Sequence, residues 1–186
     1  MKLLRKLSII TEISALSLCV SNFAMADHPI SKPRTYQNKV ESALIWVEPV
    51  KMSPMPTMLN GKYDIHNELD QHAITGDKMG FGVGGWIPDC QVACVIEKVN
   101  KKNTTSQKWI NVFSMMSMVA NDGPHYGRNI KLDGPGIYHE TCKIDPPDWR
   151  GFYRHIDHET GVGSFFYPYT IQGTFTWVGS GKAGGY

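Results

Sequence analysis

The chain has 186 residues, of which 41% are hydrophobic and 19% are charged, and its formal net charge at pH 7 is +2. This length suffices for one domain with a hydrophobic core. The first 26 positions hold three basic residues and one acidic residue, so the remainder carries 16 residues of each sign. The balance argues against a nucleic-acid-binding protein, which usually has a basic face and a high pI.

Residues 1–26 have the features of a cleaved secretory signal peptide. Three basic residues begin the segment, a largely apolar stretch follows, and Ala-Met-Ala at positions 24–26 is a typical cleavage sequence. We therefore expect export to the periplasm and a mature domain of residues 27–186. No later segment approaches the roughly 20 apolar residues of a membrane span, so none is expected.

Six segments are predicted to form β-strands, because they are rich in β-branched and aromatic residues and are separated by Gly, Pro and Asn. They are residues 43–51, 62–74, 90–99, 109–119, 136–144 and 168–178. Strands at this spacing predict a single all-β domain, a β-sandwich. Residues 100–107 are expected to form a polar hairpin loop, and residues 80–85 and 123–127 are expected to form glycine-rich turns.

Methionines recur every third position in a proline-rich segment, at Met52, Met55 and Met58. Thioethers in an extended loop favour Cu(I). The alternative, which we favour from the sequence, is that these side chains cover an apolar surface.

Ionisable residues occupy every second position of the second predicted strand. They are His66, Glu68, Asp70 and His72. On a strand they share one face, about 6.5–7 Å from neighbour to neighbour, so adjacent members can hold a metal ion. The alternative is an ordinary solvent-exposed polar face opposite an apolar one.

Three cysteines follow the signal peptide: Cys90, Cys94 and Cys142. On one strand Cys90 and Cys94 would be about 13 Å apart, too far for a disulfide. Either one can instead bond to Cys142 in an oxidising compartment, which leaves one thiol. A thiolate metal site is the less favoured alternative, because the C-x-x-C spacing is absent.

Two later segments bring further metal-ligating residue types together. Residues 118–127 place Met118, Asp122 and His125 around a tight turn, and residues 151–163 contain His155 and His158 between glycines. Imidazole suits copper, iron and zinc, a thioether favours copper, and a carboxylate favours harder ions. Copper and iron are therefore the expected metals, with manganese or zinc as substitutes.

These three segments resemble motifs of the bacterial periplasmic ferrous-iron transport proteins, the partners of an Ftr-type iron permease. The resemblance covers D-I-H-x-E-x-D-x-H at 64–72, M-V-A-N-D-G-P-H-Y-G at 118–127 and the G-F-x-R-H-I-D segment that starts at Gly151. It implies an immunoglobulin-like β-sandwich that forms a homodimer. Asn121, Tyr153 and His158 depart from the usual family residues.

The resemblance also implies a copper site near the subunit interface, with one methionine and three histidines as ligands: Met118, His66, His125 and His155. Glu68, with Asp122 close by, corresponds to an acidic group beside that site that is implicated in binding a second or alternative metal. The implied function is capture of iron in the periplasm and its delivery to an inner-membrane permease.

We therefore predict a metal-binding and delivery protein rather than an enzyme. The alternatives are a periplasmic copper chaperone or resistance protein, a metal-dependent redox enzyme, and an immunoglobulin-like surface antigen with an incidental metal.

Overall fold

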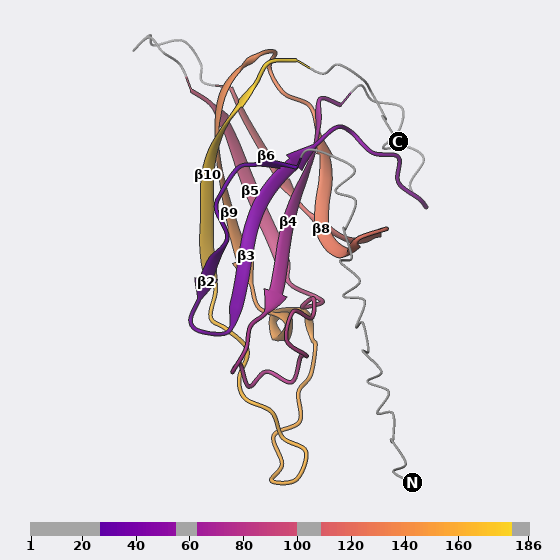
Figure 1. The fold of residues 1–186 in the computed structure, drawn as a ribbon, viewed down its shortest axis with the longest axis vertical. Coiled ribbons are helices and arrows are strands. Elements are labelled where there is room, and N and C mark those ends of the chain that lie inside the picture. Colours follow the sequence, from indigo (N-terminus) through magenta and orange to yellow (C-terminus); the bar gives the residue numbers. More distant parts are fainter. Residues whose placement is uncertain (1–26, 55–62, 100–108, 180–186) are drawn as a thin grey trace, which may run out of the picture.

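In the computed structural model, which describes residues 27–54, 63–99 and 109–179, the chain forms two antiparallel β-sheets that pack face to face (Figure 1). The first sheet has the order β1-β3-β4-β8-β7, with β2 beside β3, and the second has the order β10-β9-β5-β6. The strands are β1 (His28–Pro29), β2 (Arg34–Tyr36), β3 (Val40–Val47), β4 (Ile65–Ala73), β5 (Gln91–Lys98), β6 (Ile110–Ser114), β7 (Met116–Ala120), β8 (Gly123–Ile130), β9 (Gly136–Asp145) and β10 (Tyr169–Trp177). The predicted all-β, immunoglobulin-like sandwich is confirmed.

The core lies between the facing sheets. Leu44, Leu69 and Tyr126 of the first sheet and Ile144 and Ile171 of the second are almost fully buried. Because side chains alternate along a strand, the opposite face of β4 and β8 points away from this core. The polar row of β4 lies on that outer face.

Two polar contacts also join the sheets inside the core. Asn67 Nδ2 donates a hydrogen bond to Glu140 at 2.9 Å, and Gln71 Nε2 donates one to the Tyr169 hydroxyl at 2.8 Å. Buried polar groups that are paired in this way fix how one sheet lies on the other. They fix the position of β4, which carries the polar row, relative to the second sheet.

Cys94 and Cys142 lie directly opposite each other on β5 and β9 and form a disulfide. Cys90 is a buried free thiol. The prediction that one of the two earlier cysteines bonds to Cys142 is confirmed. The alternative of a thiolate metal site is wrong, because the bond consumes two of the three sulfurs.

Two strand predictions need correction. Residues 109–119 form two strands, β6 in the second sheet and β7 in the first, with the break at the buried Met115. Residues 123–127 are not a turn but the start of β8, which pairs with β4 and β7. Pairing with β7, and with β4 from Tyr126 onward, outweighs the weak strand preference of glycine. The turn itself is only Asn121 and Asp122.

Some predictions lie outside the described residues: the signal peptide, the loop at 100–107, Met55 and Met58. Within the described ranges, no helix has the length and apolar character to cross a membrane.

Candidate metal centre

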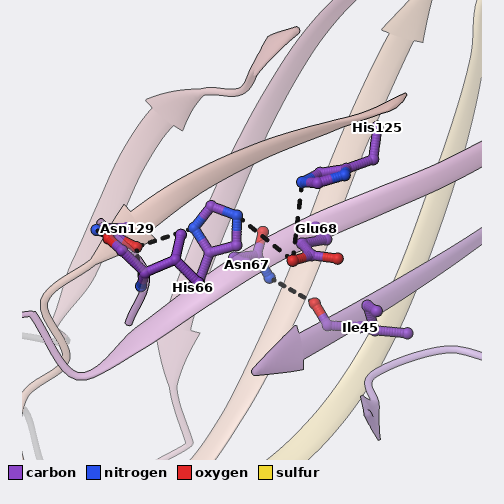
Figure 2. Close-up of polar contacts among 7 residues, drawn as sticks. Ile45, His66, Asn67, Glu68, His125 and Asn129 are labelled. Carbon is purple, nitrogen blue, oxygen red and sulfur yellow. Dashed lines mark hydrogen bonds and ion pairs between the residues drawn. The ribbon is translucent and has the colours of Figure 1, made fainter. Parts of the chain in front are cut away.

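The strand register brings distant residues together on the outer face of the first sheet. Met118 of β7 pairs with His125 of β8, while Glu68 and His66 of β4 pair with Gly127 and Asn129 of β8. Residues directly opposite each other in an antiparallel pair share a face. Three strands thus supply one cluster, part of which is shown in Figure 2.

The cluster is tight and largely closed to solvent. His66 Nε2 lies 3.4 Å and His125 Nε2 lies 3.8 Å from the same oxygen, Glu68 Oε1 (Figure 2). The side chains of His66, His125 and Glu68 are 1%, 8% and 14% exposed. The three donor atoms all lie within 4.8 Å of one another. The alternative of a solvent-exposed polar face is therefore wrong for His66 and Glu68.

Gly127 makes room for this cluster. A Cβ atom at position 127 would lie only 2.7 Å from His66 Nε2 and 3.1 Å from the Asn67 carbonyl oxygen. Any larger residue would push the imidazole away from Glu68. The glycine of the family motif thus has a steric role within a strand rather than a role in a turn.

Asn129 orients the His66 ring. Its Nδ2 donates to the Val50 carbonyl at 2.7 Å, which fixes the amide orientation, and its Oδ1 lies 2.9 Å from His66 Nδ1. Nδ1 is therefore the protonated nitrogen, and Nε2 has its lone pair directed toward Glu68. A hydrogen bond of this kind commonly sets the tautomer of a metal-ligating histidine. The sequence analysis missed Asn129, although its strand parity with His125 and Gly127 was a usable signal.

The protonation states of the cluster suit a bound cation. Burial lowers the pKa of His66 to about 4, so this imidazole is neutral near pH 7. Burial, together with the negative charges of Asp70, Asp122 and Asp27, raises the pKa of Glu68 to about 8. The His66–Glu68 contact is therefore not an ion pair at neutral pH. A bound metal ion would take the lone pair of a neutral imidazole and displace the carboxyl proton.

The unpaired nitrogens fit a metal as well. Among the described residues, neither His66 Nε2 nor His125 Nε2 has a hydrogen-bond partner, although both atoms are buried. A buried polar atom without a partner is costly to the fold. Two such atoms that converge on one carboxylate form the donor set that a transition metal would satisfy.

Two cavities meet at Glu68 and His125. The larger, about 660 Å³, is lined by the methionines Met52, Met116 and Met118 and by His66. The smaller, about 300 Å³, is lined by polar and acidic residues, namely Asp27, Asp70, His72 and Asp122, and by Trp86. Glu68 and His125 line both cavities. The sequence analysis treated Asp70 and His72 as part of one row with Glu68, but it did not place Asp27 or Met116.

His155 is the one predicted ligand that lies elsewhere. It is in the loop between the 3-10 turn η2 (Pro147–Arg150) and β10, which projects beyond the sheets at the lower end of Figure 1. Its side chain is 74% exposed, and it lines neither cavity. Thr160 donates to Asp157 Oδ2 and has its oxygen 2.7 Å from His155 Nδ1, so Nδ1 carries the proton and Nε2 carries the lone pair.

Fold and donor set together define a class, that of β-sandwich metal-binding proteins. The sequence profile of the family described as "Fe2+ transport protein" matches residues 24–179. The chain belongs to this Fe2+ transport protein family.

Relatives span most of the chain. A UPF0423 protein of Brucella abortus is 40% identical over 176 residues, which are 92% of this chain and 93% of the relative. The 34 kDa membrane antigen of Treponema pallidum is 32% identical over 142 residues, which are 73% of this chain and 67% of the relative.

Solved structures agree with the fold. A copper-bound Glu→Gln variant of FetP from uropathogenic Escherichia coli superposes with a TM-score of 0.71 at 38% identity, over 83% of this chain and 99% of FetP. Copper-reconstituted P19 from Campylobacter jejuni gives a TM-score of 0.71 at 34% identity, over 84% of this chain and 99% of P19. Both of those structures are of copper-containing protein.

Proposed function

We propose that this chain is a periplasmic metal-binding protein of a high-affinity iron-uptake system. It binds copper and iron at His66, Glu68, Met118 and His125 and supplies iron to an inner-membrane permease. The observation that carries the proposal is the pair of buried, unpartnered Nε2 atoms 3.4 and 3.8 Å from one Glu68 oxygen. Membership of the Fe2+ transport protein family and the copper-bound relatives support it.

The donor set explains how one site serves two metals. Two imidazoles with the Met118 thioether suit copper, whereas Glu68 with Asp122 nearby adds the oxygen donors that Fe(II) and Mn(II) prefer. Iron is the cargo, and copper is an alternative occupant of the same donors. The protein acts by binding and delivery, and its residues hold the ions without turnover.

His155 completes the site from a second copy of the chain. Within one chain it is exposed and apart from the cluster, but its ring is already held by Thr160 with Nε2 free. Tyr153 and Ile156, on either side of it, are 93% and 77% exposed, so the loop presents apolar surface next to the imidazole. Docking of this loop on the outer face of another copy would cover these residues and bring a third imidazole to the cluster.

Subunit mixing tests this arrangement. The His155→Ala variant and the His66→Ala/His125→Ala variant each lack one part of every site, and each is expected to bind Cu(II) weakly. Heterodimers formed by co-expression would contain one intact site, so purification through a different tag on each variant should recover about one tightly bound Cu(II) per dimer. If the mixed protein binds no better than its parents, His155 does not act across an interface.

Metal titration tests the function itself. The purified mature protein should bind about one Cu(II) and, separately, about one Mn(II) per subunit, and His66→Ala should abolish tight binding of both. Asn111→Ala, in the other sheet, is the matched control. Deletion of the gene should then slow growth under iron limitation, whereas copper sensitivity alone would favour the copper-chaperone alternative.

A further inference from the structure

Among the described residues, three thioethers line the larger cavity, although the proposed metal centre uses only Met118. Met116 and Met118 come from alternate positions of β7, so they lie on the same face of the sheet. Met52 lines the same cavity from the segment that follows β3. All three side chains are half-buried.

Met116 lies close to the imidazole pair because of Gly127. Residue 127 pairs with Met116 on one side and with Glu68 on the other. It has no side chain, and the space where its Cβ would be is 2.7 Å from His66 Nε2. Nothing on β8 at this position therefore separates the Met116 thioether from the His66 ring.

Met52 is held near the same ring by Asn129. The Val50 amide donates to Asn129 Oδ1 at 3.3 Å, and Asn129 Nδ2 donates to the Val50 carbonyl at 2.7 Å. The same amide oxygen accepts from His66 Nδ1. One asparagine thus positions both the imidazole and the short segment that carries Met52.

The chemistry of the cavity differs from that of its neighbour. Thioether sulfur is a soft, uncharged donor that prefers Cu(I), and it adds little affinity for Fe(II) or Mn(II). In the part of the chain that the structure describes, the smaller cavity is lined by no methionine and by four carboxylates, those of Asp27, Glu68, Asp70 and Asp122. The larger cavity therefore suits a soft ion, and the smaller cavity, on the other side of Glu68 and His125, suits a hard one.

We infer that Met52 and Met116 form, together with Met118, a thioether site for Cu(I) in the larger cavity, next to the imidazole pair. The inference rests on the proposed metal-binding function and adds a second position for copper within it. A Cu(I) ion would occupy the sulfur donors without using the carboxylate side of Glu68. Copper would thus reach the cluster through the larger cavity, and the iron cargo would reach it through the smaller one.

Methionine methyl resonances test the site. Protein with 13C-labelled methionine methyl groups is titrated with Ag(I), a redox-inert probe for Cu(I), and the Met52 and Met116 signals are assigned by Met52→Leu and Met116→Leu. Both signals should shift at one Ag(I) per subunit, and the double variant should bind Ag(I) about tenfold or more weakly. Met115→Leu, which changes the buried neighbour of Met116, is the matched control and should leave the affinity unchanged.

The His66→Ala/His125→Ala variant separates this inference from the proposed function. It should lose Cu(II) and Mn(II) while Met52 and Met116 still respond to Ag(I). If only the Met118 signal responds in the wild type, the thioether site is wrong even though the imidazole centre stands. If the wild type shifts all three methyl signals but binds neither Cu(II) nor Mn(II), the thioether site stands and the proposed centre fails.

Discussion

The cavity on the thioether side and the cavity on the carboxylate side share Glu68 and His125 but otherwise differ in every donor. The first offers sulfur from Met52, Met116 and Met118, and the second offers oxygen from Asp27, Asp70 and Asp122. A protein that handles copper and iron needs both kinds of donor, because soft and hard ions do not prefer the same ligands. Under the proposed function, this difference in donors lets one cluster bind a soft ion and a hard ion.

The largest loss of affinity, for both metals, is expected when a residue shared by the two cavities is removed. His125→Ala deletes the buried imidazole that lines both cavities, so affinity for Cu(II) and for Mn(II) should each fall about 100-fold or more. Isothermal titration of both ions measures this loss. His158→Ala, an exposed histidine of the projecting loop, is the control and should change neither affinity. Loss of only one metal would show that the cavities do not share this ligand.

Glu68→Gln should sharpen the comparison, because it should lower the affinity for a hard ion more than the affinity for a soft one. Mn(II) affinity should fall about tenfold, and Cu(I) affinity should change less than that. In the wild type the carboxyl pKa is raised to about 8, so Mn(II) must displace a proton below that pH. Mn(II) affinity should therefore rise with pH from about 6 to about 8 and then level off. The glutamine variant should show a flatter profile, and an equal slope in both proteins would contradict the role of Glu68.

The opposite effect is expected at Met118. Met118→Leu keeps the volume and apolar character of the side chain but removes the sulfur. Cu(I) affinity, measured by competition with a chromophoric chelator, should fall about tenfold, while Mn(II) affinity stays within about twofold. An equal loss for both ions would mean that the substitution disturbs the cluster rather than one side of it.

The smallest effect on metal binding is expected from Glu140→Gln, on the core side of β4. Complete burial raises the pKa of Glu140 to about 8. Its Oε1 lies 3.2 Å from Cys142 Sγ, and because a disulfide sulfur has no hydrogen, the neutral carboxyl is the donor there. The folded state holds this proton more tightly than the unfolded state does. The stability it contributes is complete below about pH 4.5 and is lost as pH rises toward 8, by up to about 1.4 kcal/mol per unit.

Glutamine cannot ionise, so the variant should lose less stability than the wild type between pH 5 and pH 8. Urea unfolding at the two pH values measures the difference. Affinity for Cu(II) and Mn(II) should be unchanged. If metal affinity falls as well, the different metal preferences of the two cavities depend on the packing of the core and not on the donor atoms alone.

Much of the fold followed from local pattern. The alternation of β4 correctly predicted which side chains share a face, since strand parity is a property of the backbone. The break at Met115 was not predictable, because a strand that changes sheets has the same local composition as one that continues. The strand at Gly123–Gly127 was missed for a related reason, since its pairing with β7, and that of Tyr126 and Gly127 with β4, depends on tertiary context.

The site was predictable only in part. His66, Glu68, Met118 and His125 were identified from motif resemblance and do lie around one cluster. Asn129, Asp27 and Met116 were not identified, because their roles depend on which strands pair and in what register. The placement of His155 in a projecting loop was also beyond local pattern.

The most direct test of the central claim is a competition between two ions. Protein loaded with one Mn(II) per subunit is titrated with Cu(II) while released Mn(II) is followed by its electron paramagnetic resonance signal. Shared ligands predict that each bound Cu(II) releases one Mn(II), so that release is complete at one Cu(II) per subunit. If Cu(II) saturates the protein while Mn(II) stays bound, Glu68 and His125 do not form one centre common to the two cavities.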